Sequence, residues 1–328
     1  MLGAETNPIL APSDEVIQEL AQDLGKEDHF AKTKVAVHFG EAGKTVPDPY
    51  FNGKGPDRTG CIHCGACMTG CRHNAKNTLD KNYLYLAQQL GTEIIAEREV
   101  YDILPIDGAM GSTGYHVYFK SSTSRGGKSI VKAGNVIFSG GVLGTVPLLL
   151  KLKSGKSLPY LSDMVGCNIR TNNESLMLVT TTAKQHEDFT KGVAIGSILD
   201  LDENSHLEPV RYGQGSGFFR MLTIPSFPSK SALVRLLGVL GIMVRKPVRL
   251  LKTIFTKNYS ERTFVLLFMQ TLDSTLRLKL GNITQLKTSK ESGTAPSGYI
   301  PEASAVAQAV GDKVKAIPYA NFTDVLLG

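Results

Sequence analysis

Four of the five cysteines form one C-x2-C-x2-C-x3-C run, at Cys61, Cys64, Cys67 and Cys71. Thiolates at this spacing can wrap one face of an iron–sulfur cubane, which would make the protein an electron carrier. Two features count against a cluster: Arg72 follows the run where a proline is usual, and only Cys167 remains to complete a ligand set. A structural zinc site would place its pairs of ligands further apart. The alternative is a compact turn of small residues whose thiols bind nothing.

A second pattern places glycines between an apolar stretch and a helix. Residues 136–138, Val-Ile-Phe, predict a short buried strand, and Gly140 and Gly141 predict a turn without side chains. A helix follows, with Thr145 as its expected cap and Gly155 at its end. A strand that leads through glycine into a helix N-terminus suits a phosphate-bearing or other polar ligand. Tight packing of helix on strand would explain the same glycines.

Several segments, spread over nearly the whole chain, are similar to one enzyme family. They read CGACMTGCRHNAKNTLDKNYL (64–84), EVYDI (99–103), VIFSGGVLGT (136–145), RTNNE (170–174) and YIP (299–301). Together they resemble the glucose–methanol–choline oxidoreductases, most closely the branch that is similar to cholesterol oxidases. In this context we expect the thiols of the cysteine run to bind no cluster, since the family uses the segment as a turn into its flavin domain.

The resemblance implies an FAD-dependent enzyme that passes a hydride from the CH–OH group of a sterol or other bulky alcohol to the flavin, which oxygen or another acceptor then reoxidises. It places the backbone of Val100 against the adenine ring of FAD, and Gly140, Gly141 and Gly144 in the flavin domain. Asn172 falls at a crossover between domains that passes near flavin and substrate in the family. An ordinary polar loop is the alternative for Asn172.

Glu261 is the one catalytic candidate that the resemblance offers. It opens a predicted strand, residues 261–271, that is similar to the strand on which sterol-oxidising members carry a carboxylate base for moving the steroid double bond. Such a base works in an apolar cavity, where desolvation raises a carboxylate's pKa. The alternative is an exposed Glu261 that pairs with a lysine.

Two features typical of the family do not occur in this sequence. There is no G-x-G-x-x-G segment to hold a pyrophosphate. None of the seven histidines matches the family's active-site histidine segment, which handles the hydroxyl proton. We therefore expect an internal fragment that lacks the N-terminal dinucleotide-binding motif and the C-terminal histidine segment, ends on the apolar Val325, Leu326 and Leu327, retains little FAD and is inactive alone.

Composition limits the other functions that the chain could have. The 328 residues are 42% hydrophobic and 20% charged, which is enough apolar material for one or two domains. The net charge of +6 comes without runs of like charge, which argues against nucleic-acid binding. The first residues do not form a signal peptide, and no apolar run reaches ~18 residues. We expect a cytoplasmic protein with reduced thiols, and the sequence predicts no oligomeric state.

Hydrophobic periodicity predicts the elements that must position these groups. A helix should follow Ser13, its expected cap, with Asp14 and Glu15 in the first turn. Helical faces are also expected after Leu79 and from Pro301. Strands are predicted at 34–39, 93–96, 100–104, 115–119, 129–131, 176–182, 193–199, 218–224, 263–271 and 275–280.

This order predicts an α/β part followed by an α+β part. With the resemblance, it implies a partial Rossmann-type FAD-binding domain over residues 61–168 and an antiparallel-sheet substrate-binding domain over 169–328. Residues 1–60 would be a substrate-domain portion and linker.

Between residues 230 and 257 the chain is both basic and apolar. The apolar side chains are those of Leu233, Leu236, Leu237, Leu240, Met243 and Val244. Basic side chains flank them at Arg235, Arg245, Lys246, Arg249, Lys252 and Lys257, and Pro247 should break the helix. A basic amphipathic helix of this kind can make transient contact with a membrane surface. The alternative is a helix pair that only packs on the sheet.

Overall fold

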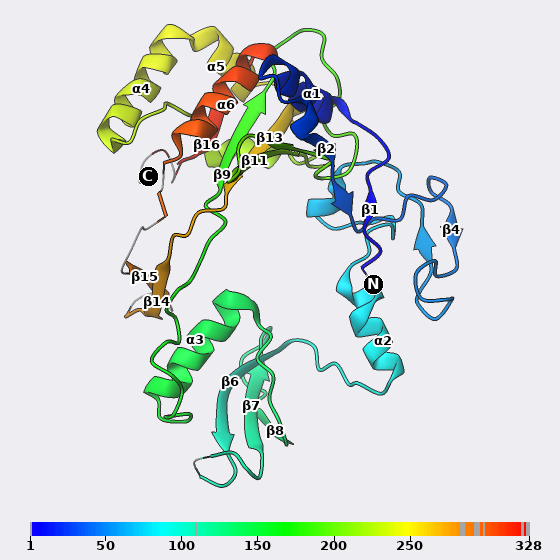
Figure 1. Ribbon diagram of the computed structural model, residues 1–328, viewed down its shortest axis with the longest axis vertical. Helices are drawn as coiled ribbons and strands as arrows, with labels where there is room; N and C mark the ends of the chain where they lie inside the picture. The colour runs from blue at the N-terminus through cyan, green and yellow to red at the C-terminus, as the bar shows by residue number, and fades with distance from the viewer. Residues whose placement is uncertain are drawn as a thin grey trace. The chain divides into compact units, whose positions relative to one another are not determined.

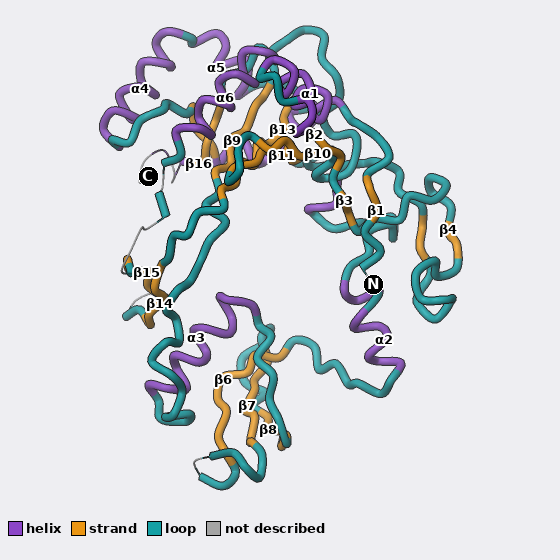
Figure 2. Tube along the Cα trace, in the orientation of Figure 1, coloured by secondary structure: helices purple, strands orange, loops and turns teal. Residues whose placement is uncertain are grey.

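The computed structural model describes residues 2–108, 110–282, 286–291, 296–297, 299–322 and 325. The chain divides into two compact units, each of which is built from more than one stretch of sequence. Unit 1 comprises residues 1–92, 172–272 and 297–328, and unit 2 comprises residues 93–171 and 273–296. Both mix helices with antiparallel sheets (Figures 1 and 2). The assignment of cofactor and substrate roles to domains bounded at 60 and 168 stays a prediction.

The centre of unit 1 is a seven-stranded sheet in the order β12-β16-β9-β13-β11-β10-β2, with every neighbouring pair antiparallel. The strands are β2 (Phe30–Lys32), β9 (Ser175–Thr180), β10 (Ser197–Asp200), β11 (Ser205–Val210), β12 (Thr223–Pro225), β13 (Thr263–Gln270) and β16 (Pro318–Asn321). Side chains of a strand alternate between the two faces, and both faces of β9 and β13 are apolar, so the sheet needs cover on both sides.

Two helices cover one face of this sheet, α1 (Pro12–Asp23) and α6 (Pro301–Lys313), and they contact each other (Figure 1). Ile17 and Leu20 of α1 and Ala307 of α6 pack against Val179 and Phe264 of the sheet. The apolar stripe predicted for the helix from Pro301 is therefore confirmed. Each of these side chains is almost fully buried, which is worth about 1.5–3 kcal/mol for a large aliphatic or aromatic group.

Two more helices, α4 (Ala232–Arg245) and α5 (Pro247–Ile254), cover the opposite face. Ile242 and Leu250 pack against the cluster formed by Leu178, Val265 and Tyr319. Two 3-10 turns, η4 (Gly217–Leu222) and η5 (Tyr259–Arg262), contact each other. No helix of the described residues is long and apolar enough to cross a membrane.

The rest of unit 1 consists of short elements that carry the cysteine run. These are β1 (Glu5–Thr6), η1 (Glu27–His29), β3 (Lys34–Val35), β4 (Thr45–Val46), β5 (Arg58–Thr59), η2 (Ala66–Met68), η3 (Leu79–Lys81) and α2 (Tyr83–Gln89). Arg58 is fully buried and organises this region, because its guanidinium donates to the carbonyls of Pro56 and Lys81 and to the amide oxygen of Asn77.

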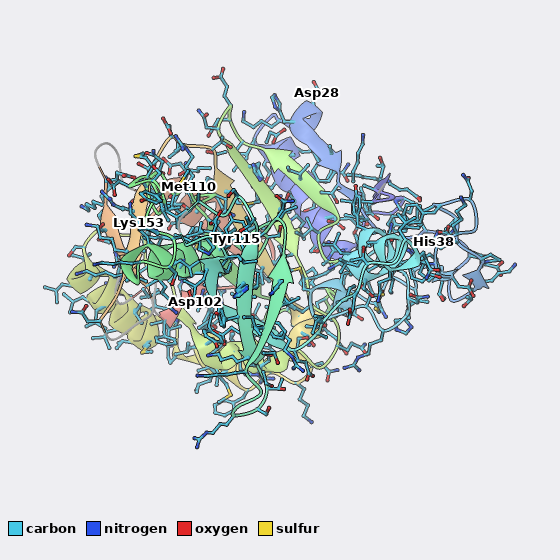
Figure 3. The ribbon with its side chains drawn as sticks, turned by 90° about the horizontal axis from the view of Figure 1, so that it is seen from below. Asp28, His38, Asp102, Met110, Tyr115 and Lys153 are labelled. Atoms are coloured by element: carbon cyan, nitrogen blue, oxygen red, sulfur yellow. The ribbon has the colours of Figure 1, made fainter. Side chains whose placement is uncertain are left out.

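Unit 2 has a three-stranded antiparallel sheet, a helix and a separate hairpin. The elements are β6 (Arg98–Pro105), β7 (Tyr115–Ser121), β8 (Ser129–Ala133), α3 (Gly141–Ser154), β14 (Leu276–Leu280) and β15 (Leu286–Lys290). α3 contacts both β6 and β14. Figure 3 marks Asp102 and Tyr115 on the strands of this unit and Lys153 on its helix. A bulge between Val100 and Asp102 increases the local twist of β6.

Several predicted strands were wrong, and two of them fail for the same reason. Residues 136–138 and 93–96 are loops, although they are rich in β-formers, because no strand among the described residues pairs with them. Of the segment predicted to be buried, Ile137 is 88% exposed, and Val136 and Phe138 are only partly buried. Residues 218–224 begin instead as a 3-10 turn, which Arg220 closes by donating to the carbonyl of Gly217 at 2.9 Å.

The predicted helix caps also need correction. Ala11 is the N-cap of α1 and Ser13 lies buried inside the first turn, because Pro12 already holds the helical φ one residue earlier. α3 begins at Gly141, and Thr145 reaches back from within the helix to accept the N–H of Gly140 at 3.0 Å.

A fully buried ion pair joins α1 to the sheet. Asp14 and Arg211 are both 0% exposed, with Oδ1 of Asp14 2.7 Å from Nη2 of Arg211. Asp14 also accepts from the hydroxyl of Ser197 at 2.8 Å and from the N–H of Ala11 at 2.9 Å. Arg211 donates to the carbonyl of Lys191 at 2.8 Å. Removal of either charge would leave the other buried without its partner.

We expect Arg211→Met to lower the free energy of unfolding by about 3–5 kcal/mol, since a buried carboxylate loses its counter-ion. Lys313→Met is the matched control, because Lys313 also bridges α6 to α1 but pairs with the exposed Glu19 and Asp23; we expect a change below about 1 kcal/mol. Denaturant titration followed by circular dichroism measures both. Equal losses of unfolding free energy for the two variants would show that the buried pair contributes no more to stability than an exposed pair.

Candidate cofactor site

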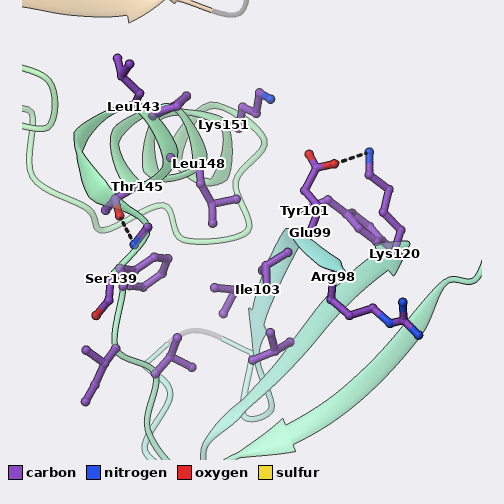
Figure 4. Close-up of a pocket in the computed structure, with 18 residues that line it drawn as sticks. Arg98, Glu99, Tyr101, Ile103, Lys120, Ser139, Leu143, Thr145, Leu148 and Lys151 are labelled. Carbon is purple, nitrogen blue, oxygen red and sulfur yellow. Dashed lines mark hydrogen bonds and ion pairs between the residues drawn. The ribbon is translucent and has the colours of Figure 1, made fainter. Parts of the chain in front are cut away.

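A cavity of about 560 Å³ lies inside unit 2, between α3, the segment before it and the strands β6 and β7 (Figure 4). Its size falls in the range of about 300–1,000 Å³ that is usual for small-molecule sites. Ile103, Val136, Phe138 and Leu148 give it an apolar wall. A second cavity of about 380 Å³ shares Ile103, Val136 and Phe138 with the first and continues toward Met110 and Tyr115, which Figure 3 labels.

The N-terminus of α3 opens on the first cavity without a capping side chain. Gly140 is the N-cap, and both Gly140 and Gly144 line the cavity. Gly141 has φ +66°, a conformation that side chains rarely adopt, so glycine is required there. A Cβ atom at Gly141 or Gly144 would meet nothing within 4 Å, so the backbone of the first turn is open to a ligand. Uncapped N–H groups at a helix N-terminus favour a phosphate or another anion.

The charged side chains of the cavity lining have a positive excess. They are Arg98, Lys120 and Lys151 against the single carboxylate of Glu99. Lys120 lies 3.3 Å from Glu99, and both side chains are about half exposed, so this pair contributes little to stability (Figure 4). Arg98 and Lys151 have no carboxylate partner among the described residues. The cavity therefore combines an apolar wall with cations and free backbone donors, which fits a nucleotide.

The sequence pointed to only part of this lining. Val100, Gly140 and Gly144 are brought together by the fold, whereas Arg98, Lys120 and Lys151 were missed. A signal for the lysine existed, since Gly144, Leu148 and Lys151 recur at helical spacing. Lys120 could have been found from the hairpin, because its register places it opposite Glu99. Arg98 carried no such signal.

The two remaining candidates, Asn172 and Glu261, belong to unit 1. Asn172 donates to the carboxylate of Glu174 at 2.6 Å, and its carbonyl accepts the N–H of Gln270 at 3.1 Å. Glu261 lies in η5, directly before β13 and not inside it. Its carboxylate accepts from the amide of Asn258 at 2.9 Å and of Gln214 at 3.4 Å, so it pairs with amides and not with a lysine.

The cysteine run folds as a turn against an apolar cluster. Cys61 is buried, and Cys67 and Cys71 pack with it against Val37 and Val193. All five cysteines are free thiols. The four cysteines of the run line one small cavity. Among the described residues, no group of three or more His, Cys, Asp or Glu side chains has a geometry that could hold a metal ion.

The cysteine run needs a glycine at Gly65 because another backbone segment approaches it closely. It has φ +67°, and a Cβ atom there would lie 2.1 Å from the carbonyl oxygen of Thr190. This close approach lets the N–H of Gly65 donate to the carbonyl of Gly192, while the N–H of Gly192 donates to the carbonyl of His63, both at 2.9 Å. The cysteine turn is thereby tied to the loop beside Arg211.

Known proteins are similar to this chain over the same residues. Residues 53–172 match the model of the GMC oxidoreductase family. The chain is 38% identical over 336 residues to a cholesterol oxidase of Acinetobacter baumannii, in an alignment that covers 99% of this chain and 60% of that protein. It is 35% identical over 332 residues to a cholesterol oxidase of Mycobacterium tuberculosis, covering 97% of this chain and 57% of that protein. The chain spans less than two thirds of the length of these relatives.

The cavity with its open helix N-terminus lies inside the matched segment. Over residues 53–172 the chain is similar to the GMC oxidoreductases, a family of FAD-binding oxidoreductases. Over nearly its whole length it is similar to cholesterol oxidases.

The thiols of the run should differ in reactivity. Burial raises the pKa of Cys61 to about 11. Burial also acts to raise the pKa of Cys71, but the backbone N–H groups of Lys76, Ala75 and His73 outweigh it and hold this pKa below its usual value. At mildly alkaline pH more of Cys71 is therefore thiolate, the form that reacts.

We expect iodoacetamide to label Cys71 well before Cys61 in the native protein, with the order read by peptide mass spectrometry and abolished in denaturant. Equally fast labelling of both would contradict the packing of the turn. Stoichiometric iron and acid-labile sulfide in anaerobically purified protein would restore the iron–sulfur alternative.

Proposed function

We propose that the protein serves an FAD-dependent oxidation of the CH–OH group of a sterol or similarly bulky alcohol. The family supports an FAD-dependent alcohol oxidoreductase, and the names of the relatives support a sterol as the substrate. The observation that carries the proposal is the first cavity of unit 2, where an uncapped helix N-terminus, three cations and an apolar wall converge.

The residues of this cavity fit the adenosine diphosphate part of FAD. Val100 and the apolar wall would lie against the adenine ring, and Gly140, Gly141 and Gly144 would leave the backbone N–H groups of α3 free for a phosphate. Arg98, Lys120 and Lys151 would make the cavity lining as a whole favourable to an anionic ligand. FAD, when bound, supplies the acceptor for the hydride of the alcohol.

A partial Rossmann arrangement remains part of the proposal. In such a domain, the turn at Gly140 would carry the backbone into α3 beside the cofactor. The seven-stranded antiparallel sheet of unit 1 would belong to the substrate-binding domain. Asn172, where the chain passes from unit 2 back to unit 1, would mark the crossover.

Gly144→Leu tests the cofactor site directly. The new side chain would project into the cavity and should weaken FAD and ADP binding at least about tenfold, or ~1.4 kcal/mol, in isothermal titration. The helix should tolerate the change, since Leu has a higher helix propensity than Gly. Val142→Leu is the control, because Val142 lies on the same helix but outside the cavity lining. Absence of saturable nucleotide binding, or equal binding by both variants, would contradict the proposal.

Glu261 stays a prediction as the isomerisation base. In a preparation that oxidises cholesterol, Glu261→Gln should abolish movement of the steroid double bond and spare oxidation, because the amide cannot carry the proton. Glu208→Gln is the control, because Glu208 lies on β11 and burial raises its pKa, as the site of a base would. Chromatography of the steroid products decides. Isomerisation lost with Glu208→Gln and kept with Glu261→Gln would remove Glu261 from the site.

A further inference from the structure

The helix pair α4–α5 is apolar on two opposite sides. Its inner side packs on unit 1: Val239 and Arg235 are buried, and Ile242 and Leu250 contact the sheet cluster. The guanidinium of Arg235 is held from within, since it donates to the carbonyl of Val325 at 2.8 Å and to that of Ser229 at 2.9 Å. These contacts of the inner side are sufficient to hold the helices on the sheet.

The outer side should be polar if it faced only water, and it is not. Its exposed side chains are those of Leu233, Leu237, Leu240, Val244, Val248, Leu251 and Phe255. Val244 is 80% exposed and Phe255 is 75% exposed, so they are not partly hidden core residues. A helix on the surface of a globular protein normally carries charged and polar residues on the side away from the core. Exposed apolar surface of this extent marks an interaction site.

The charges around this apolar side all have the same sign. Between residues 226 and 260 the sequence contains no Asp or Glu. Lys230, Arg245, Lys246, Lys252 and Lys257 are exposed, and none of them forms an ion pair in the described part of the chain.

We propose that the outer side of α4–α5 docks on a lipid surface that carries anionic headgroups. The apolar side chains would lie at the boundary between headgroups and acyl chains, and the unpaired cations would lie against the lipid phosphates. A second copy of the chain is disfavoured as the partner, because two copies of the same positively charged surface would repel each other. This inference rests on the helix pair and holds whether or not the cavity of unit 2 binds FAD.

Vesicle sedimentation tests the proposal with the whole chain. Binding is expected to phosphatidylcholine vesicles that contain phosphatidylserine and to be much weaker with phosphatidylcholine alone. Replacement of Arg245, Lys246 and Lys252 by Gln should lower the partition coefficient on the order of 10- to 100-fold. The control replaces Lys54, Lys132 and Lys184 by Gln, which removes the same charge from exposed positions elsewhere and should leave binding nearly unchanged.

A second variant separates insertion from simple charge attraction. Val244→Ser, Val248→Ser and Phe255→Ser together keep every cation and should still lower binding to anionic vesicles, while unfolding curves stay unchanged because the three sites are exposed. Equal sedimentation with neutral and anionic vesicles would overturn the proposal. So would self-association in solution that the serine variant abolishes, since a second copy would then cover this side.

Discussion

The buried pair between Asp14 and Arg211 is the interaction on which most of unit 1 depends. Two charges without solvent are costly unless each is compensated, and here the helix terminus, a strand and a loop all contribute to the compensation. Two glycines make room for it, because a Cβ atom at Gly196 would lie 2.5 Å from Asp14 and one at Gly192 would lie 2.1 Å from Arg211. The loop that carries these glycines also anchors the cysteine turn, so the pair fixes α1, the sheet and the turn together.

The sequence predicted most accurately those elements whose apolar residues find their packing partners within the described residues. The strand β13 and the helix α6 lie close to their expected positions, because the apolar residues of both face a core that the chain itself supplies. Residues 136–138 have an equally strong apolar pattern, yet they form no strand, since a strand also needs a neighbour for its hydrogen bonds. Propensity describes the residue, whereas pairing is a property of its surroundings.

The candidate cofactor site was predictable to the same extent. Glycines before a helix are visible in the sequence, and the resemblance pointed to Val100, whose register on β6 brings it to the same cavity. The cations come from a hairpin and from the last turn of α3, and their convergence depends on how these elements pack. The two basic regions of the protein therefore differ in kind: in unit 2 cations line a concave cavity sized for one ligand, whereas on α4–α5 they flank an exposed apolar surface.

The cavity beside α3 is the place where we propose that the adenosine diphosphate part of FAD binds. A crystal structure of the protein grown with FAD or ADP tests it most directly. We predict that the adenine lies against Val100 and that a phosphate lies at the N-terminus of α3, beside Gly140 and Gly144. A nucleotide ordered at another place in the protein, with this cavity filled only by solvent, would contradict the claim.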